Sequence, residues 1–121
     1  MAKILLIEDM KGVRESLEVI LQMAGHTLEV ANDGAAGLQK IGAGSYDLII
    51  TDILMPEVDG TEVIIQSKQS NPSIPVLAIS AGGNGVSADQ ALEIASQKAN
   101  AVLVKPFSKD ELLNQVNTLI G

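Results

Sequence analysis

Five polar residues lie at or just after the ends of apolar runs and could do chemistry together: Glu8, Asp9, Asp52, Ser80 and Lys105. Three carboxylates that gather within several Å repel one another, so either some bind protons or a cation lies among them. Magnesium suits such a site when a carbonyl, retained waters and a phosphate complete its ligands. With a hydroxyl and an ammonium added, the set has the parts of a phosphoryl-transfer site, in which an Asp carboxylate can be the nucleophile.

The elements that must position these residues follow from the apolar pattern. Apolar runs of strand length occupy residues 4–7, 27–31, 48–51, 76–79 and 101–104. Segments of helical period occupy residues 11–24, 34–41, 60–69, 87–97 and the stretch from Ser108 onward. Strict alternation predicts one α/β domain, in which five parallel strands and five helices form three layers joined by right-handed crossovers.

Ligands bind beyond the carboxyl ends of the strands in such sheets. This rule brings all five polar residues to one edge of the predicted sheet. The strand over 27–31 ends at Ala31 and Asn32 and adds nothing comparable.

Each residue also has an ordinary interpretation. Asp52 alone could be a helix N-cap, and Glu8 with Asp9 could be an acidic helix start that the helix dipole favours. Lys105 could simply be exposed. Because all of them fall at one edge, the sequence favours the functional interpretation.

Composition excludes several classes of function. The chain has 121 residues, which predicts one domain, here residues 1–121. It has no cysteine, so disulfides, thiolate zinc sites and thiol catalysis are excluded. A net charge of -7 and the scarcity of aromatic residues argue against nucleic-acid binding. No segment has the roughly 20 apolar residues of a membrane helix, and none has the form of a signal peptide. We therefore expect a cytoplasmic protein with no membrane partner.

Four motifs in combination carry a family resemblance: "LLIED" at 5–9, "DLIITDILMPEVDG" at 47–60, "PVLAIS" at 75–80 and "VLVKPFS" at 102–108. The whole chain resembles the receiver domain of bacterial two-component response regulators, in particular the single-domain, chemotaxis-type ones. The resemblance implies a flavodoxin-like fold with strand order 2-1-3-4-5.

The resemblance also implies a metal-dependent phosphorylation. It makes Asp52 the phosphoacceptor, which takes its phosphoryl group from a histidine kinase or a histidine phosphotransfer protein. Asp9, Asp52 and the backbone carbonyl of Leu54 would ligate Mg²⁺, with Mn²⁺ as an alternative, and Glu8 would hold the ion through water.

Three further residues have implied roles at this site. Lys105 would pair with the carboxylate of Asp52 and then with its phosphate. Ser80 would donate to a phosphoryl oxygen and carry the conformational signal. Pro106 would follow Lys105 through a cis peptide bond.

Some positions depart from the family pattern. Val102 stands where the family often has Tyr or Phe, so the switch would depend on Ser80 and the glycine-rich loop at 81–85, for which we predict mobility. Leu54 lies two residues after the acceptor and could shield the phosphate from water. Away from the site, we expect Tyr46 to pack at the start of the third strand without a polar partner.

The predicted function is that of a phosphoacceptor signalling domain, not of an enzyme with a small-molecule substrate. If the chain is complete, it has no output domain and acts by relaying phosphate or by binding a target through residues 87–121. Three alternatives remain: a receiver cut from a larger kinase or transcription factor, an aspartate-nucleophile phosphatase, and a pseudo-receiver that takes no phosphate. Leu54 breaks the Asp-x-Asp spacing of the phosphatase, and the five polar residues argue against the pseudo-receiver.

Overall fold

The computed structural model describes residues 2–53, 60–80 and 98–120. Its strands are β1 (Lys3–Ile7), β2 (Thr27–Ala31), β3 (Leu48–Asp52), β4 (Val76–Ser80) and β5 (Ala101–Val104). Its helices are α1 (Lys11–Met23), α2 (Gly34–Ala43), α3 (Gly60–Ser70) and α5 (Lys109–Ile120). The predicted helix over 87–97, the loop at 81–85 and Leu54 lie outside the described residues.

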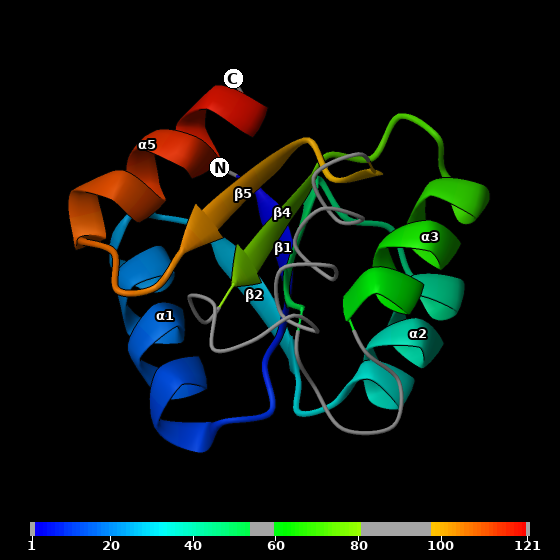
Figure 1. The fold of residues 1–121 in the computed structure, drawn as a ribbon, viewed down its shortest axis with the longest axis horizontal. Helices are drawn as coiled ribbons and strands as arrows, with labels where there is room; N and C mark the ends of the chain where they lie inside the picture. Colours follow the sequence, from blue (N-terminus) through cyan, green and yellow to red (C-terminus); the bar gives the residue numbers. More distant parts are fainter. Residues whose placement is uncertain (1, 54–59, 81–97, 121) are drawn as a thin grey trace, which may run out of the picture.

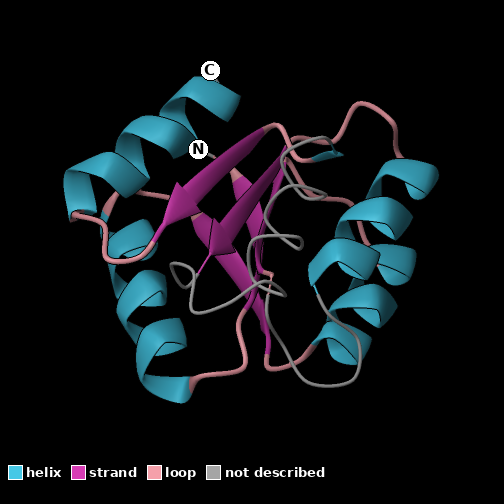
Figure 2. Ribbon diagram, viewed as in Figure 1, coloured by secondary structure: helices cyan, strands magenta, loops and turns pink. Residues whose placement is uncertain are grey.

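The strands form one parallel sheet in the order β2-β1-β3-β4-β5, which confirms the predicted topology. Figure 1 shows α1 and α5 on one face of the sheet and α2 and α3 on the other, and Figure 2 shows the same three layers coloured by element type. None of the described helices has the length and apolar character needed to span a membrane.

The two faces of the sheet carry separate hydrophobic cores because successive side chains of a strand point to opposite sides. Leu21 of α1 and Leu112 of α5 pack on the face that includes Leu6 of β1. Ile64 of α3 packs on the other face, which includes Ile7. The central strands β1, β3 and β4 are therefore covered on both sides, while the edge strands β2 and β5 are partly exposed.

The register of the sheet sets where each strand ends. Ile7 pairs with Thr51, so the residue after β1 is level with the last residue of β3. Ser80 pairs with Val104, so the residue after β5 lies just beyond the end of β4. The sheet therefore brings the polar residues that follow β1, β3, β4 and β5 to one edge.

Two local features at helix starts explain why the chain turns where it does. Gly60 begins α3, and its amide donates to the carbonyl of Ile53 at 2.8 Å. A Cβ atom at this position would lie 2.6 Å from Cα of Ile53 and would overlap the carbonyl oxygen of Asp52, so the close approach requires glycine. At α5, Ser108 and Glu111 exchange bonds of 3.0 and 3.1 Å and form a capping box at the start of the helix.

Candidate functional site

Three carboxylates meet at the carboxyl edge of the sheet. Glu8, Asp9 and Asp52 each offer an oxygen, and these oxygens all lie within 4.8 Å of one another. Glu8 is 1% exposed and Asp52 is 4% exposed, while Asp9 is half-buried. Buried carboxylates at this separation need compensation by protons or cations.

Lys105 supplies one positive charge to this cluster. Its Nζ lies 3.1 Å from Oδ2 of Asp52 and 3.2 Å from Oε1 of Glu8. Burial alone would lower the pKa of Lys105, but the two carboxylates together raise it above its usual value. The lysine is therefore charged at neutral pH and bridges two strand ends.

Ser80 lies beside this lysine at the end of β4. It is 4% exposed, and its carbonyl accepts the backbone amide of Lys105 at 2.8 Å. The peptide bond between Lys105 and Pro106 is cis, as expected from the resemblance.

The surroundings of Glu8 raise the pKa of its carboxyl group. Burial, the negative charge of Asp52 and a hydrogen bond with Asp52 raise the pKa of Glu8 from 4.5 to about 7. The charge of Lys105 and the amide of Met10, which donates to Oε2 at 3.3 Å, oppose this shift without cancelling it. A further cation among the carboxylates would favour the charged form of Glu8.

The donor set fits a magnesium ion. All of its atoms are hard carboxylate oxygens, two of the three acids are buried, and the oxygens lie within 4.8 Å of one another. Among the described residues, Glu8, Asp9 and Asp52 are the group that could hold such an ion.

The interpretation of Glu8 and Asp9 as an acidic start of helix α1 does not hold in the structure. Helix α1 starts after Met10, whose side chain makes no capping bond, and its first turn contains no acidic residue. The two acids therefore precede the helix and are directed into the site. Asp52 is the last residue of β3 and does not cap a helix either.

The structure adds two polar contacts that sequence reasoning missed. Nη1 of Arg14 donates to the carbonyl oxygen of Glu8 at 3.0 Å. The hydroxyl of Tyr46 donates to Oε1 of Glu29 at 3.2 Å, so the expectation that Tyr46 has no polar partner is wrong. Neither contact had a signal in the sequence pattern: Arg14 and Glu8 lie six residues apart across the turn that precedes α1, and Tyr46 and Glu29 lie 17 residues apart on different elements.

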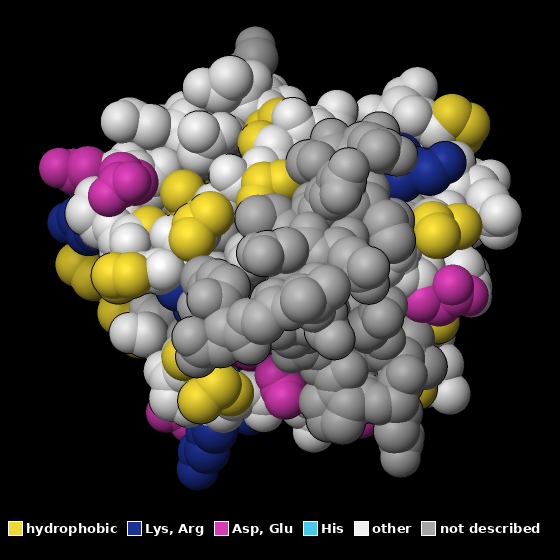
Figure 3. Space-filling model, in the orientation of Figure 1, with side chains coloured by type: hydrophobic (Ala, Val, Ile, Leu, Met, Phe, Trp, Pro, Cys, Tyr) yellow, Lys and Arg dark blue, Asp and Glu magenta, His cyan; other side chains and the backbone are white. Residues whose placement is uncertain are grey.

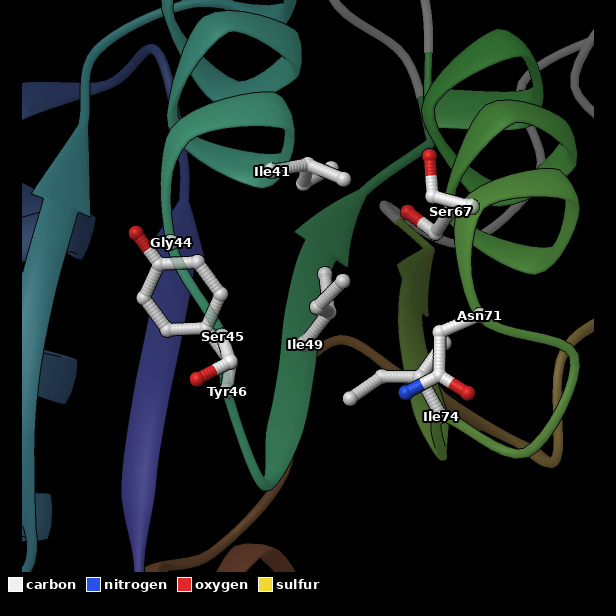
Figure 4. A pocket seen from close by; sticks show the side chains of 9 residues that line it. Ile41, Gly44, Ser45, Tyr46, Ile49, Ser67, Asn71 and Ile74 are labelled. Atoms are coloured by element: carbon white, nitrogen blue, oxygen red, sulfur yellow. The ribbon is translucent and has the colours of Figure 1, made fainter.

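A pocket of about 300 Å³ lies elsewhere, between α2 and α3 near the start of β3 (Figure 4). The side chains of Ile41, Ile49 and Ile74 line it, together with Tyr46 and Ser67. Its described lining contains no carboxylate and no lysine, so the chemistry-bearing residues of the chain lie at the carboxyl edge of the sheet instead.

Comparison with known proteins agrees with this geometry. The model of the response regulator receiver domain family matches residues 4–117. The chain is 36% identical over 118 residues to the transcriptional regulatory protein CusR of Escherichia coli, covering 98% of this chain and 51% of CusR. It is 33% identical to the response regulator MprA of Mycobacterium ulcerans, covering 98% of this chain and 50% of MprA. The chain thus spans about half the length of the curated relatives it matches.

Solved structures of response regulators also resemble this chain in fold. A Francisella response regulator receiver domain superposes with a TM-score of 0.86 at 30% identity, covering 99% of this chain and 97% of that one. The response regulator protein TrrA from Thermotoga maritima, solved in complex with Mg²⁺–BeF, superposes with a TM-score of 0.88 at 31% identity. That match covers 98% of this chain and 99% of TrrA.

Proposed function

The chain belongs to the response regulator receiver domain family, and from this premise we propose that its Asp52 accepts a phosphoryl group from a histidine kinase or a histidine phosphotransfer protein. The observation that carries the proposal is the pairing of Asp52, 4% exposed at the end of β3, with the ammonium of Lys105 at 3.1 Å. We propose further that residues 1–121 act as one phosphoacceptor signalling domain.

In the proposed step, one carboxylate oxygen of Asp52 attacks the phosphorus of a phosphohistidine. A P–O bond forms on Asp52 while the P–N bond breaks, and the released imidazole nitrogen takes a proton from water. Mg²⁺, or Mn²⁺ in its place, would neutralise phosphoryl oxygens when bound, and TrrA in complex with Mg²⁺–BeF supports this choice of metal.

The chain's own residues orient the group and balance its charge. Lys105 already lies against Oδ2 of Asp52, so a small movement lets its ammonium pair with a phosphoryl oxygen. Ser80 is buried at the end of the neighbouring strand, where its hydroxyl can donate to another phosphoryl oxygen. The carbonyl of Ser80 accepts a hydrogen bond from the amide of Lys105, so a movement at the end of β4 would also move the start of the segment after β5.

The readout we propose is protein binding through residues 87–121, of which 98–120 are described. Val104 on β5 is 47% exposed and offers an apolar contact to a partner within this range. Figure 3 shows hydrophobic side chains reaching the surface on the side of α1 and α5, while Lys and Arg lie apart from one another on this face. This distribution favours a protein target over nucleic acid.

Phosphorylation by a small donor tests the proposal directly. Wild type and Asp52→Asn are incubated with Mg²⁺ and acetyl phosphate, and intact masses are measured. We expect wild type alone to gain one phosphoryl mass, which alkali removes and acid preserves. Asp33→Asn is the matched control, because asparagine can also cap α2 at this exposed position. An equal gain on wild type and Asp52→Asn, or no gain on either, overturns the proposal.

A further inference from the structure

Arg14 of α1 is hydrogen-bonded to the segment that carries Glu8 and Asp9, two of the three acids of the site. Its guanidinium Nη1 donates to the carbonyl oxygen of Glu8 at 3.0 Å. That carbonyl belongs to the peptide leading into Asp9, so the bond holds the orientation of this peptide. The backbone amide of Arg14 also donates to the carbonyl of Met10 at 2.9 Å, where α1 begins.

The peptide that follows Asp9 is held differently. Its amide, that of Met10, donates to the carboxylate of Glu8 at 3.3 Å. This contact uses an oxygen of the acid cluster itself and competes with any cation that enters the cluster. The bond from Arg14 uses a backbone carbonyl, so it takes up no carboxylate oxygen of Glu8.

The bond from Arg14 to the carbonyl of Glu8 matters more because α1 has no side-chain cap at its start. The N-cap residue Met10 makes no side-chain capping bond. The helix therefore lacks the device that usually fixes the chain at a helix entry, and the guanidinium of Arg14 constrains the same turn from within the helix.

An ion pair does not explain the position of Arg14. None of the ion pairs within 4.0 Å among the described residues includes it, although Glu15 and Glu18 line the same groove on α1. The donated bond to Glu8 is thus the contact that places its guanidinium.

We propose that Arg14 is a positioning residue for the metal site, which sets the direction of Asp9 and Glu8 toward the ion. The inference rests on the proposed function, because it assumes that the three acids hold Mg²⁺. Residues that orient metal ligands are typically worth about 10- to 100-fold in metal affinity.

The direction in which Mg²⁺ affinity changes distinguishes a positioning role of Arg14 from a purely electrostatic one. Removing a positive charge near the cluster weakens its repulsion of Mg²⁺, so electrostatics alone predicts tighter binding in Arg14→Met. Loss of positioning predicts weaker binding. Lys11→Met is the matched control, since it removes one cation from the first turn of the same helix at a side chain that is 80% exposed.

The experiment measures the Kd for Mg²⁺ by calorimetry on wild type, Arg14→Met, Arg14→Lys and Lys11→Met, with folding checked by circular dichroism. We expect a Kd about tenfold higher for Arg14→Met and about threefold higher for Arg14→Lys. Lys11→Met should stay within about twofold of wild type. The rate of phosphorylation by acetyl phosphate should recover in Arg14→Met at saturating Mg²⁺, because the altered quantity is metal affinity.

Binding by Arg14→Met that equals or exceeds that of Lys11→Met overturns the inference, while the proposed function stands if wild type binds Mg²⁺ and accepts phosphate. If Arg14→Met does not fold, Arg14→Lys decides, and an unchanged Kd for that variant overturns the inference. If wild type neither binds Mg²⁺ nor accepts phosphate, both the inference and the proposed function are overturned.

Discussion

The ammonium nitrogen of Lys105 lies 3.2 Å from Oε1 of Glu8, although 97 residues separate the two in the sequence. The same nitrogen lies 3.1 Å from Oδ2 of Asp52. The family resemblance led us to expect the second contact alone. One cation therefore balances two buried carboxylates, and it occupies the space between them that a divalent ion would share.

Removal of this cation should tighten metal binding. We expect Lys105→Met to lower the Kd for Mg²⁺ by about tenfold, because the variant loses a repulsion between two cations that is worth at least about 1.4 kcal/mol in a partly buried site. The same variant should accept phosphate from acetyl phosphate more slowly, since the phosphoryl oxygens lose a charged donor. Calorimetry and intact-mass time courses measure the two effects, with the exposed Lys109→Met as control. Weaker metal binding in Lys105→Met would show that the lysine organises the acids instead of competing with the ion.

The raised pKa of Glu8 predicts a dependence of stability on pH. With a pKa raised from 4.5 to about 7, the folded protein holds this proton more tightly than the unfolded chain does. In the absence of metal, ionisation of Glu8 therefore lowers the free energy of unfolding as the pH rises from 4.5 to about 7. Glu8→Gln cannot ionise, so above pH 7 it should be more stable than wild type by roughly 3 kcal/mol.

Urea unfolding followed by circular dichroism in metal-free buffer at several pH values measures this difference, because the chain has no tryptophan. The stability advantage of Glu8→Gln should vanish as the pH falls below 4.5, because Glu8 then becomes protonated in both the folded and the unfolded state. Glu15→Gln removes an exposed carboxyl and should change stability by less than about 0.5 kcal/mol. A constant difference between Glu8→Gln and wild type at every pH would contradict the assignment.

Gly60 and Gly42 should respond in opposite ways to alanine. A Cβ on Gly60 would collide with the backbone of Asp52 and Ile53, so Gly60→Ala should lower the free energy of unfolding by about 3 kcal/mol. Gly42 lies in α2 with nothing within 4 Å of an added Cβ. Gly42→Ala should therefore raise stability by about 0.5 to 1 kcal/mol through helix propensity. Thermal unfolding compares the pair; equal effects on both would refute the close approach of α3 to β3.

Lys68 should stabilise the opposite end of the sheet. Its ammonium donates to the carbonyl of Ile74 at 2.5 Å and to Oδ1 of Asn100 at 2.6 Å, and this oxygen also accepts the amide of Val76 at 3.0 Å. Lys68→Met should lower the free energy of unfolding by about 1 kcal/mol, because two acceptors lose a charged donor in a partly exposed site. Denaturant unfolding beside the exposed Lys98→Met provides the comparison, and an equal loss in both variants would argue against a specific role for Lys68.

Local signals predicted the elements well. The five apolar runs became the five strands, and the predicted ends of the described elements lie within two residues of those observed. The capping box of Ser108 and Glu111 was predictable because both partners lie within one helical turn. The strand order came from the family resemblance, and the structure agrees with it.

The sequence by itself determined that acids, a hydroxyl and a lysine lie at the carboxyl ends of neighbouring strands. The strand ends follow from apolar periodicity, and parallel strands share one carboxyl edge. The tertiary structure alone decided that Glu8 is buried between Asp52 and Lys105, and that Arg14 holds the carbonyl of Glu8. The first feature depends on where side chains from distant segments meet and on the exclusion of water around them, and the second depends on how the turn before α1 is folded. No local sequence pattern encodes the burial of Glu8 or the bond from Arg14, so both become visible only when the sheet and its helices are assembled.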